Sequence, residues 1–163
     1  MQNEKNKKIF IIKKEVVMNN IKTWVQGETL AKDYLIENGY KIIDLNFKNK
    51  LGEIDIIAID PQIRQQENLK KKVKNGEMEE GLARRLNAMC EDVLVFVEVK
   101  ARENEFLWNP LFAVNKQKQN KIIKTAKFYI KFKNLQEFQV RFDVIAVSDN
   151  KITHIENAFQ VNE

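Results

Sequence analysis

Two carboxylates and a lysine interrupt apolar, β-branched segments of this 163-residue chain. Asp55 stands inside the run 54–59, and Glu98 and Lys100 end the run that begins at Val93. Residues two apart on a strand project from one face, about 7 Å apart, so Glu98 and Lys100 should lie side by side. A charged side chain among buried apolar residues is costly unless it is paired or binds a metal. If the two strands are neighbours, Asp55 and Glu98 form an oxygen-ligand site suited to Mg²⁺ or Mn²⁺.

Such a site could hydrolyse phosphodiesters with a metal-activated water, which Lys100 would orient or help to deprotonate. Glu28 belongs to the same set, because on its helix it is rotated by only about 20° from Leu35 and so shares the apolar face. The predicted catalytic residues are Asp55, Glu98, Lys100 and Glu28, and the predicted metal ligands are Asp55, Glu98 and Glu28. In the alternative interpretation the first three form a structural ion-pair cluster, and the helix dipole favours a first-turn glutamate at position 28.

Composition excludes several other kinds of chemistry. One cysteine and one histidine cannot supply a disulfide framework or a zinc site. The five glycines form no phosphate-cradling loop, so nucleotide-dependent chemistry is not expected. A serine hydrolase would have to use Ser148 and His154, the only residues of their types. No apolar run near the N-terminus is long enough for a signal peptide or a membrane span, so we expect a cytoplasmic protein with no membrane contact.

Positive charge is concentrated in two segments, although the formal net charge is only +5. Residues 1–22 carry six lysines against two glutamates, and residues 116–133 carry seven lysines and no acid. Clustered lysines suit a nucleic-acid backbone, DNA above all, because each neutralised phosphate releases counterions. The candidate phosphate contacts are Arg102, Lys116, Lys121, Lys124 and Lys127. Alternatively, these lysines only decorate solvated faces.

Hydrophobic periodicity and turn residues predict an α/β protein with the element order α-β-β-β-α-β and a further short strand. The predicted helices cover 21–38, 77–89 and 115–133, and the predicted strands cover 40–47, 54–59, 93–100, 140–147 and 152–155. Gly39 should end the first helix. We expect a basic N-terminal extension over 1–20, a single domain over 21–159, and an insertion at about 61–92. Arg141 and Asp143 should form a structural pair, either with each other or with a neighbouring residue, and His154 is expected to be structural.

The segments Gly52–Ala58 and Val95–Arg102, together with Gly27-Glu28, Arg141–Asp143 and His154-Ile155, resemble the YraN-like family of uncharacterised bacterial proteins. The resemblance implies a restriction-endonuclease-like core, with a mixed central sheet flanked by helices, as in the PD-(D/E)XK nuclease superfamily. By this resemblance Asp55 matches the motif aspartate, Glu98 and Lys100 match the E-x-K pair, and Glu28 matches the helix glutamate of resolvase-like members. The insertion departs from the family, which usually connects these strands briefly.

The expected function is therefore a Mg²⁺-dependent nuclease acting on DNA, either branched or single-stranded. The rival interpretation is a module on the same fold that binds nucleic acid, or a protein partner, without catalysis. The sequence leaves open whether the chain forms a homodimer.

Overall fold

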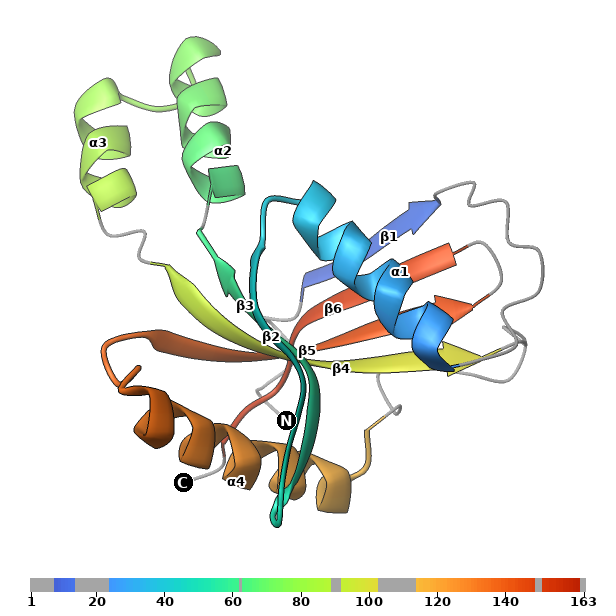
Figure 1. The fold of residues 1–163 in the computed structure, drawn as a ribbon. Coiled ribbons are helices and arrows are strands. Elements are labelled where there is room, and N and C mark those ends of the chain that lie inside the picture. Colours follow the sequence, from blue (N-terminus) through green and yellow to red (C-terminus); the bar gives the residue numbers. More distant parts are fainter. Residues whose placement is uncertain are drawn as a thin grey trace.

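A twisted mixed sheet with helices on both faces forms the body of the protein (Figure 1). The computed structural model describes residues 8–13, 24–61, 63–88, 92–102, 114–148 and 151–161. The elements in chain order are β1 (Lys8–Lys13), α1 (Trp24–Glu37), β2 (Lys41–Asn49), β3 (Gly52–Asp60), α2 (Ile63–Lys74), α3 (Glu80–Ala88), β4 (Val93–Arg102), α4 (Lys116–Lys133), β5 (Gln139–Ser148) and β6 (Lys151–Phe159). Among the described residues, no helix combines the length and the apolar character needed to cross a bilayer.

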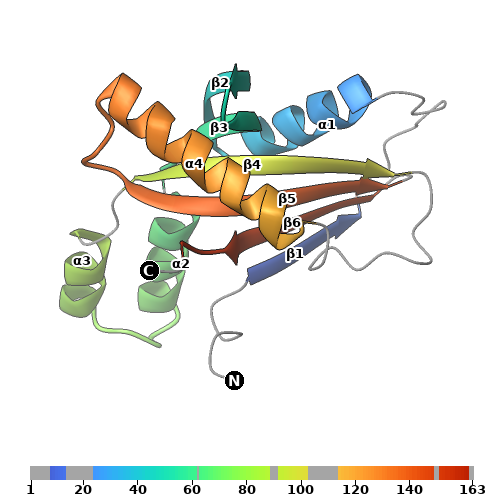
Figure 2. The same cartoon turned by 90° about the horizontal axis from the view of Figure 1, so that it is seen from below.

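The six strands lie in the order β1-β6-β5-β4-β3-β2, and only β4 and β5 are parallel. A parallel pair needs a long crossover connection, and here α4 lies between the two strands in the chain. Helix α1 covers one face of the sheet and α4 covers the other (Figure 2). Because β4 is covered on both faces, residues 94–99 are all buried. This explains why its sequence is almost continuously apolar.

The C-terminus of α1 follows the sequence prediction. Gly39 has a φ of 84°, and its N–H donates to the carbonyl of Ile36, while the N–H of Tyr40 donates to the carbonyl of Leu35. These two bonds form a Schellman motif, which needs the left-handed backbone that glycine adopts without strain. The motif turns the chain directly into β2.

The N-terminal half of α1 lies against the end of β4, and Gly27 permits the close approach. A Cβ atom built on Gly27 would come within 2.5 Å of the Ala101 Cβ atom, which has no freedom to move aside. We expect Gly27→Ala to destabilise the fold by about 1–3 kcal/mol in urea unfolding, despite the better helix propensity of alanine. The control is Gly81→Ala in α3, where a Cβ would meet nothing within 4 Å. Equal stability of the two variants would contradict the contact.

Two elements were not predicted. The insertion contains two helices rather than one: α2 was missed, and α3 begins at Glu80 instead of 77. They stand side by side beyond one end of the sheet (Figures 1 and 2). In the segment expected as an N-terminal extension, β1 pairs antiparallel with β6 and forms a sheet edge. The last strand is also longer than predicted, running from Lys151 to Phe159.

Candidate active site

The site forms where the β2–β3 hairpin parts from β4. Antiparallel pairing of β3 with β4 runs from Asp60 opposite Val93 to Ile56 opposite Val97 and then stops. Beyond this point the Val99 N–H donates to the Asp55 Oδ2 atom at 2.7 Å. The hairpin turn instead lies against α4, because a Cβ on Gly52 would be 3.0 Å from the Thr125 hydroxyl oxygen. A carboxylate thus takes the place of a backbone acceptor where the strands separate.

Glu98 is the first ionisable residue on β4. It is only 2% exposed and is held by two lysines. Its Oε1 atom lies 2.6 Å from the Lys100 Nζ atom and 3.2 Å from the Lys118 Nζ atom. Its Oε2 atom is buried and has no hydrogen-bond partner. A buried carboxylate oxygen without a partner is rare in native structures, because it carries the full cost of desolvation. This oxygen is therefore the feature of the site that most needs an explanation.

Lys118 is the functional candidate that sequence reasoning missed. It lies in the first turn of α4 and bridges Glu98 to Glu53, whose Oε1 atom is 3.6 Å from its Nζ atom. The helical period contained the signal, because Lys118 is within about 40° of the buried Ile122 and Thr125 on a helical wheel. Lys116, Lys121, Lys124 and Lys127 are all exposed on the same helix, and the side chain of Arg102 lies outside the described part of the structure.

Glu53, at the start of β3, is exposed and pairs with two lysines. Its Oε2 atom lies 3.2 Å from the Lys48 Nζ atom, in addition to its contact with Lys118. The hydrogen bond from Lys48 holds the pKa of Glu53 below its ordinary value. This residue therefore serves as a neighbouring carboxylate against which the buried pair can be tested.

Burial and like charge act together on Asp55. Burial first, and then the charge of Glu98, raise the pKa of Asp55 to about 6, although the Val99 hydrogen bond and Lys118 lower it. Glu28 on α1 adds a smaller upward effect on the same pKa, so this predicted residue faces the same region. Burial works against the charge of Lys118, but Glu98, Asp55 and Glu53 outweigh it and raise the pKa of Lys118. Lys118 therefore stays protonated beside a carboxylate that is costly to ionise.

The chemistry of these donors fits a hard divalent cation. Asp55 and Glu98 offer carboxylate oxygens, including the unpartnered Oε2 atom of Glu98. Within the described ranges, no three His, Cys, Asp or Glu residues are close enough together to hold a metal ion by themselves. Mg²⁺ commonly takes only one or two carboxylates and completes its octahedron with waters and substrate phosphate oxygens. Glu28 as a third ligand stays a prediction.

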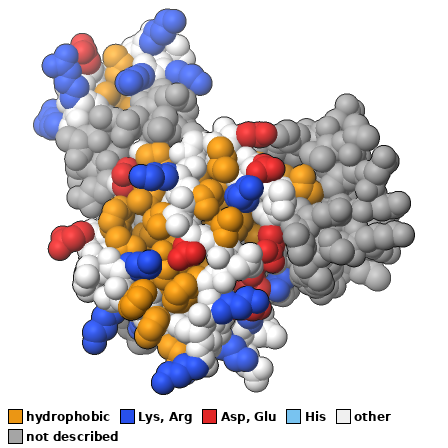
Figure 3. Space-filling view, viewed as in Figure 1, with side chains coloured by type: hydrophobic (Ala, Val, Ile, Leu, Met, Phe, Trp, Pro, Cys, Tyr) orange, Lys and Arg blue, Asp and Glu red, His pale blue; other side chains and the backbone are white. Residues whose placement is uncertain are grey.

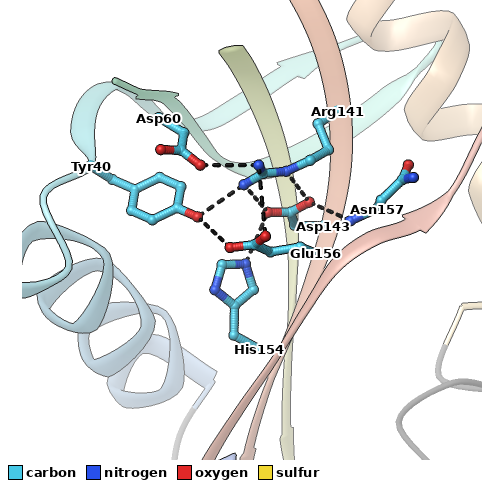
Figure 4. Close-up of polar contacts among 7 residues, drawn as sticks. All are labelled: Tyr40, Asp60, Arg141, Asp143, His154, Glu156 and Asn157. Atoms are coloured by element: carbon cyan, nitrogen blue, oxygen red, sulfur yellow. Dashed lines mark hydrogen bonds and ion pairs between the residues drawn. The ribbon is translucent and has the colours of Figure 1, made fainter. Parts of the chain in front are cut away.

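A second polar cluster lies on the α1 side of the sheet, away from α4 (Figure 4). As predicted, Arg141 and Asp143 pair, with both nitrogen–oxygen distances at 2.9 Å. Arg141 also lies 3.0 Å from an Asp60 oxygen and donates to the Tyr40 hydroxyl at 2.9 Å. The His154 Nε2 atom lies 2.9 Å from Asp143, and both side chains are fully buried. These contacts connect Tyr40, the residue before β2, with β3, β5 and β6, and favour a structural role.

Comparison with known proteins supports the resemblance seen in the motifs. A protein of Thermodesulfovibrio yellowstonii is 39% identical over 142 residues, covering 87% of this chain and 99% of the relative. A protein of Clostridium botulinum, strain Alaska E43, is 40% identical over 139 residues, or 82% and 89% of the two chains. One from Persephonella marina is 34% identical over 143 residues, or 86% and 97%. All three carry only the name UPF0102 protein. Since the profile of the uncharacterised protein family UPF0102 also matches residues 27–147, the chain belongs to this family.

Proposed function

We propose that the protein is a metal-dependent nuclease with a restriction-endonuclease-like core. It hydrolyses phosphodiester bonds of DNA at the point beyond Ile56 and Val97 where β3 and β4 separate, which we call the fork. The observation that carries this proposal is the buried Oε2 atom of Glu98, which has no hydrogen-bond partner. The charge of the same side chain helps to raise the pKa of a second carboxylate, Asp55, to about 6. A purely structural ion-pair cluster would be expected to satisfy both oxygens of its most buried member. A bound divalent cation would be the partner that the Oε2 atom of Glu98 lacks.

In this proposal Asp55 and Glu98 hold Mg²⁺ or Mn²⁺. The bound metal would lower the pKa of a water molecule and offset charge on the scissile phosphate. Lys100, fixed by its 2.6 Å contact with Glu98, orients the attacking water. Lys118 keeps its proton and is placed to pair with a phosphate oxygen. The exposed lysines of α4 contact the neighbouring backbone phosphates.

The first experiment is calorimetric titration of Mg²⁺ and Mn²⁺ into the wild type, Asp55→Asn and Glu53→Gln. Asparagine keeps an oxygen that can accept from the Val99 N–H, so this variant removes the charge and preserves the fork. We expect metal binding in the wild type and in the Glu53→Gln control, and none in Asp55→Asn. Salt-sensitive DNA binding without any metal binding would instead assign a binding module with structural carboxylates.

The same variant predicts a gain in stability in metal-free buffer. The pKa of Asp55 in the folded protein, about 6, lies above the ordinary value of 3.8. The stability that Asp55 contributes to the fold is therefore fully present below about pH 4 and is lost as the pH rises through 6. We expect Asp55→Asn to be more stable than the wild type by about 2 kcal/mol at pH 7.5, which is a rise of several degrees in Tm. The difference should shrink at pH 5. Thermal melts that show Asp55→Asn less stable at both pH values would make Asp55 structural.

A further inference from the structure

Three phenylalanine rings form a row between the edge strand β2 and the C-terminal half of α4. Phe47 stacks on Phe128, with ring centroids 6.5 Å apart and planes 26° apart. Phe128 in turn stacks on Phe132, at 5.9 Å and 11°. We call these three residues the aromatic row. They come from two elements but present nearly parallel ring planes.

The aromatic row is supported from below but open to solvent. Tyr129 packs edge-on against Phe47 at 4.8 Å, and its hydroxyl donates to the Asp44 Oδ2 atom at 3.3 Å. In contrast, Phe128 is 44% exposed and Phe132 is 63% exposed. Large exposed rings that are held in place are typical of surfaces that bind a flat or apolar group.

Lysines share the helix face with these rings. Lys121, Lys124 and Lys131 lie within about 60° of Phe128 on a helical wheel, and all three are exposed. Lys133 places its Nζ atom 5.6 Å from the centroid of the Phe132 ring. Helix α4 contains no acidic residue. Figure 3 shows hydrophobic side chains gathered over this part of the molecule, with Lys and Arg as well as Asp or Glu side chains among and around them.

We propose that the aromatic row and its lysines bind a single-stranded segment of nucleic acid, with unpaired bases stacked on the rings and phosphates on the lysines. Stacking on aromatic side chains in a basic groove is the general way in which proteins hold single strands. The charge complementarity favours a polyanion over a second copy of this basic chain. Paired bases keep their faces covered within the duplex, so a duplex can use the lysines but not the rings.

The position of the aromatic row connects it to the candidate active site. Phe128 follows Lys118 by ten residues, which is about 15 Å along the axis of α4. A single strand of nucleic acid lying along this helix would therefore pass from the aromatic row to the fork. That the bound single strand is also the strand cleaved rests on the proposed function, whereas the binding itself does not.

The test is fluorescence anisotropy with a single-stranded oligothymidylate and a duplex of equal length, using the full chain in EDTA. We expect Phe132→Ala to weaken single-strand binding about tenfold and Phe128→Ala/Phe132→Ala more strongly, with duplex binding changed less than about twofold. Phe132→Trp should restore binding. Ile36→Ala, which truncates a residue 52% exposed on α1, is the control and should leave both affinities unchanged. Both rings are exposed, and circular dichroism would check that each variant folds.

Three results would overturn this proposal. Single-strand binding that survives the double variant would remove the rings from the interface, and an equal loss for both ligands would mean that the rings do not stack on bases. Sedimentation that shows a wild-type dimer lost in Phe132→Ala, with single-strand affinity unchanged, would assign the surface to a second copy of the chain. Because no metal is present, failure of the nuclease proposal would appear separately, as single-strand binding without cleavage when Mg²⁺ is added.

Discussion

Lys100→Ala is expected to reduce Mg²⁺-dependent DNA cleavage by about 10²- to 10⁴-fold, the range found when a positioned proton donor or electrostatic group is removed from an active site. The fold should survive, because Glu98 keeps its contact with Lys118 at 3.2 Å when the Lys100 amine is removed. DNA binding should also be nearly unchanged, since Lys100 is half-buried and the exposed lysines lie on α4. Single-turnover cleavage with saturating enzyme separates this loss from any change in affinity.

Lys127→Ala supplies the matched control, because it removes an exposed lysine from α4 without touching Glu98. It should weaken DNA binding slightly, reduce the salt dependence by about one phosphate contact, and leave the single-turnover rate within about threefold of the wild type. Cleavage that persists at the wild-type rate in Lys100→Ala would reject the role given to this residue. Loss of cleavage together with loss of cooperative unfolding would show only that the cluster is structural.

The central pair of the site could be predicted because strand geometry is simple. Two-residue spacing places Glu98 and Lys100 on one face, and the structure joins their side chains at 2.6 Å. The condition set for a shared site, that the strands of Asp55 and Glu98 are neighbours, is met, since β3 and β4 are paired. Asp55 was predicted to lie near Glu98 on the cost of burying a charge, and the charge of Glu98 does raise the pKa of Asp55.

The details on which the proposed chemistry depends could not be predicted. Periodicity assumes regular pairing, but pairing with β4 ends at Ile56, and this leaves the Val99 N–H for Asp55. The position of Lys118 depends on how α4 docks against the hairpin, which is a tertiary property. That the Oε2 atom of Glu98 lacks a partner can be recognised only when the positions of both lysines are known, because both contact the Oε1 atom.

The same distinction explains the fold. Long elements with strong patterns, such as α4 and the buried strand β4, were predicted to within a few residues. Strand β1 was not, because a short apolar run between lysines becomes a strand only when β6 offers an edge. Helix α2 was missed because it is rich in lysine and glutamine and has few apolar residues to reveal a helical period.

Arg141→Met is expected to destabilise the protein by about 3–5 kcal/mol, the cost of removing one partner from a buried ionic network. Methionine fills much of the space but leaves Asp60, Asp143 and Glu156 close together without the cation that joins them. Burial tends to raise the pKa of Asp143, but its hydrogen bond with His154 and the charges of His154 and Arg141 outweigh burial and lower it. The stability that Asp143 contributes to the fold is therefore fully present above the ordinary carboxyl pKa. It is lost as the pH falls through the lower pKa that Asp143 has in the folded protein. Urea unfolding at pH 7 measures the effect.

Arg84→Met provides the control for this substitution, because Arg84 pairs with Glu80 at 2.7 Å on the exposed surface of α3. Exposed helix pairs contribute only about 0.3–0.5 kcal/mol, so the same change of residue type should have little effect there. Adding Asp60→Asn to Arg141→Met should recover part of the lost stability, because it removes one of the carboxylates that Arg141 neutralised. If the double variant is less stable than Arg141→Met alone, the loss comes from packing around Arg141 rather than from uncompensated buried charge.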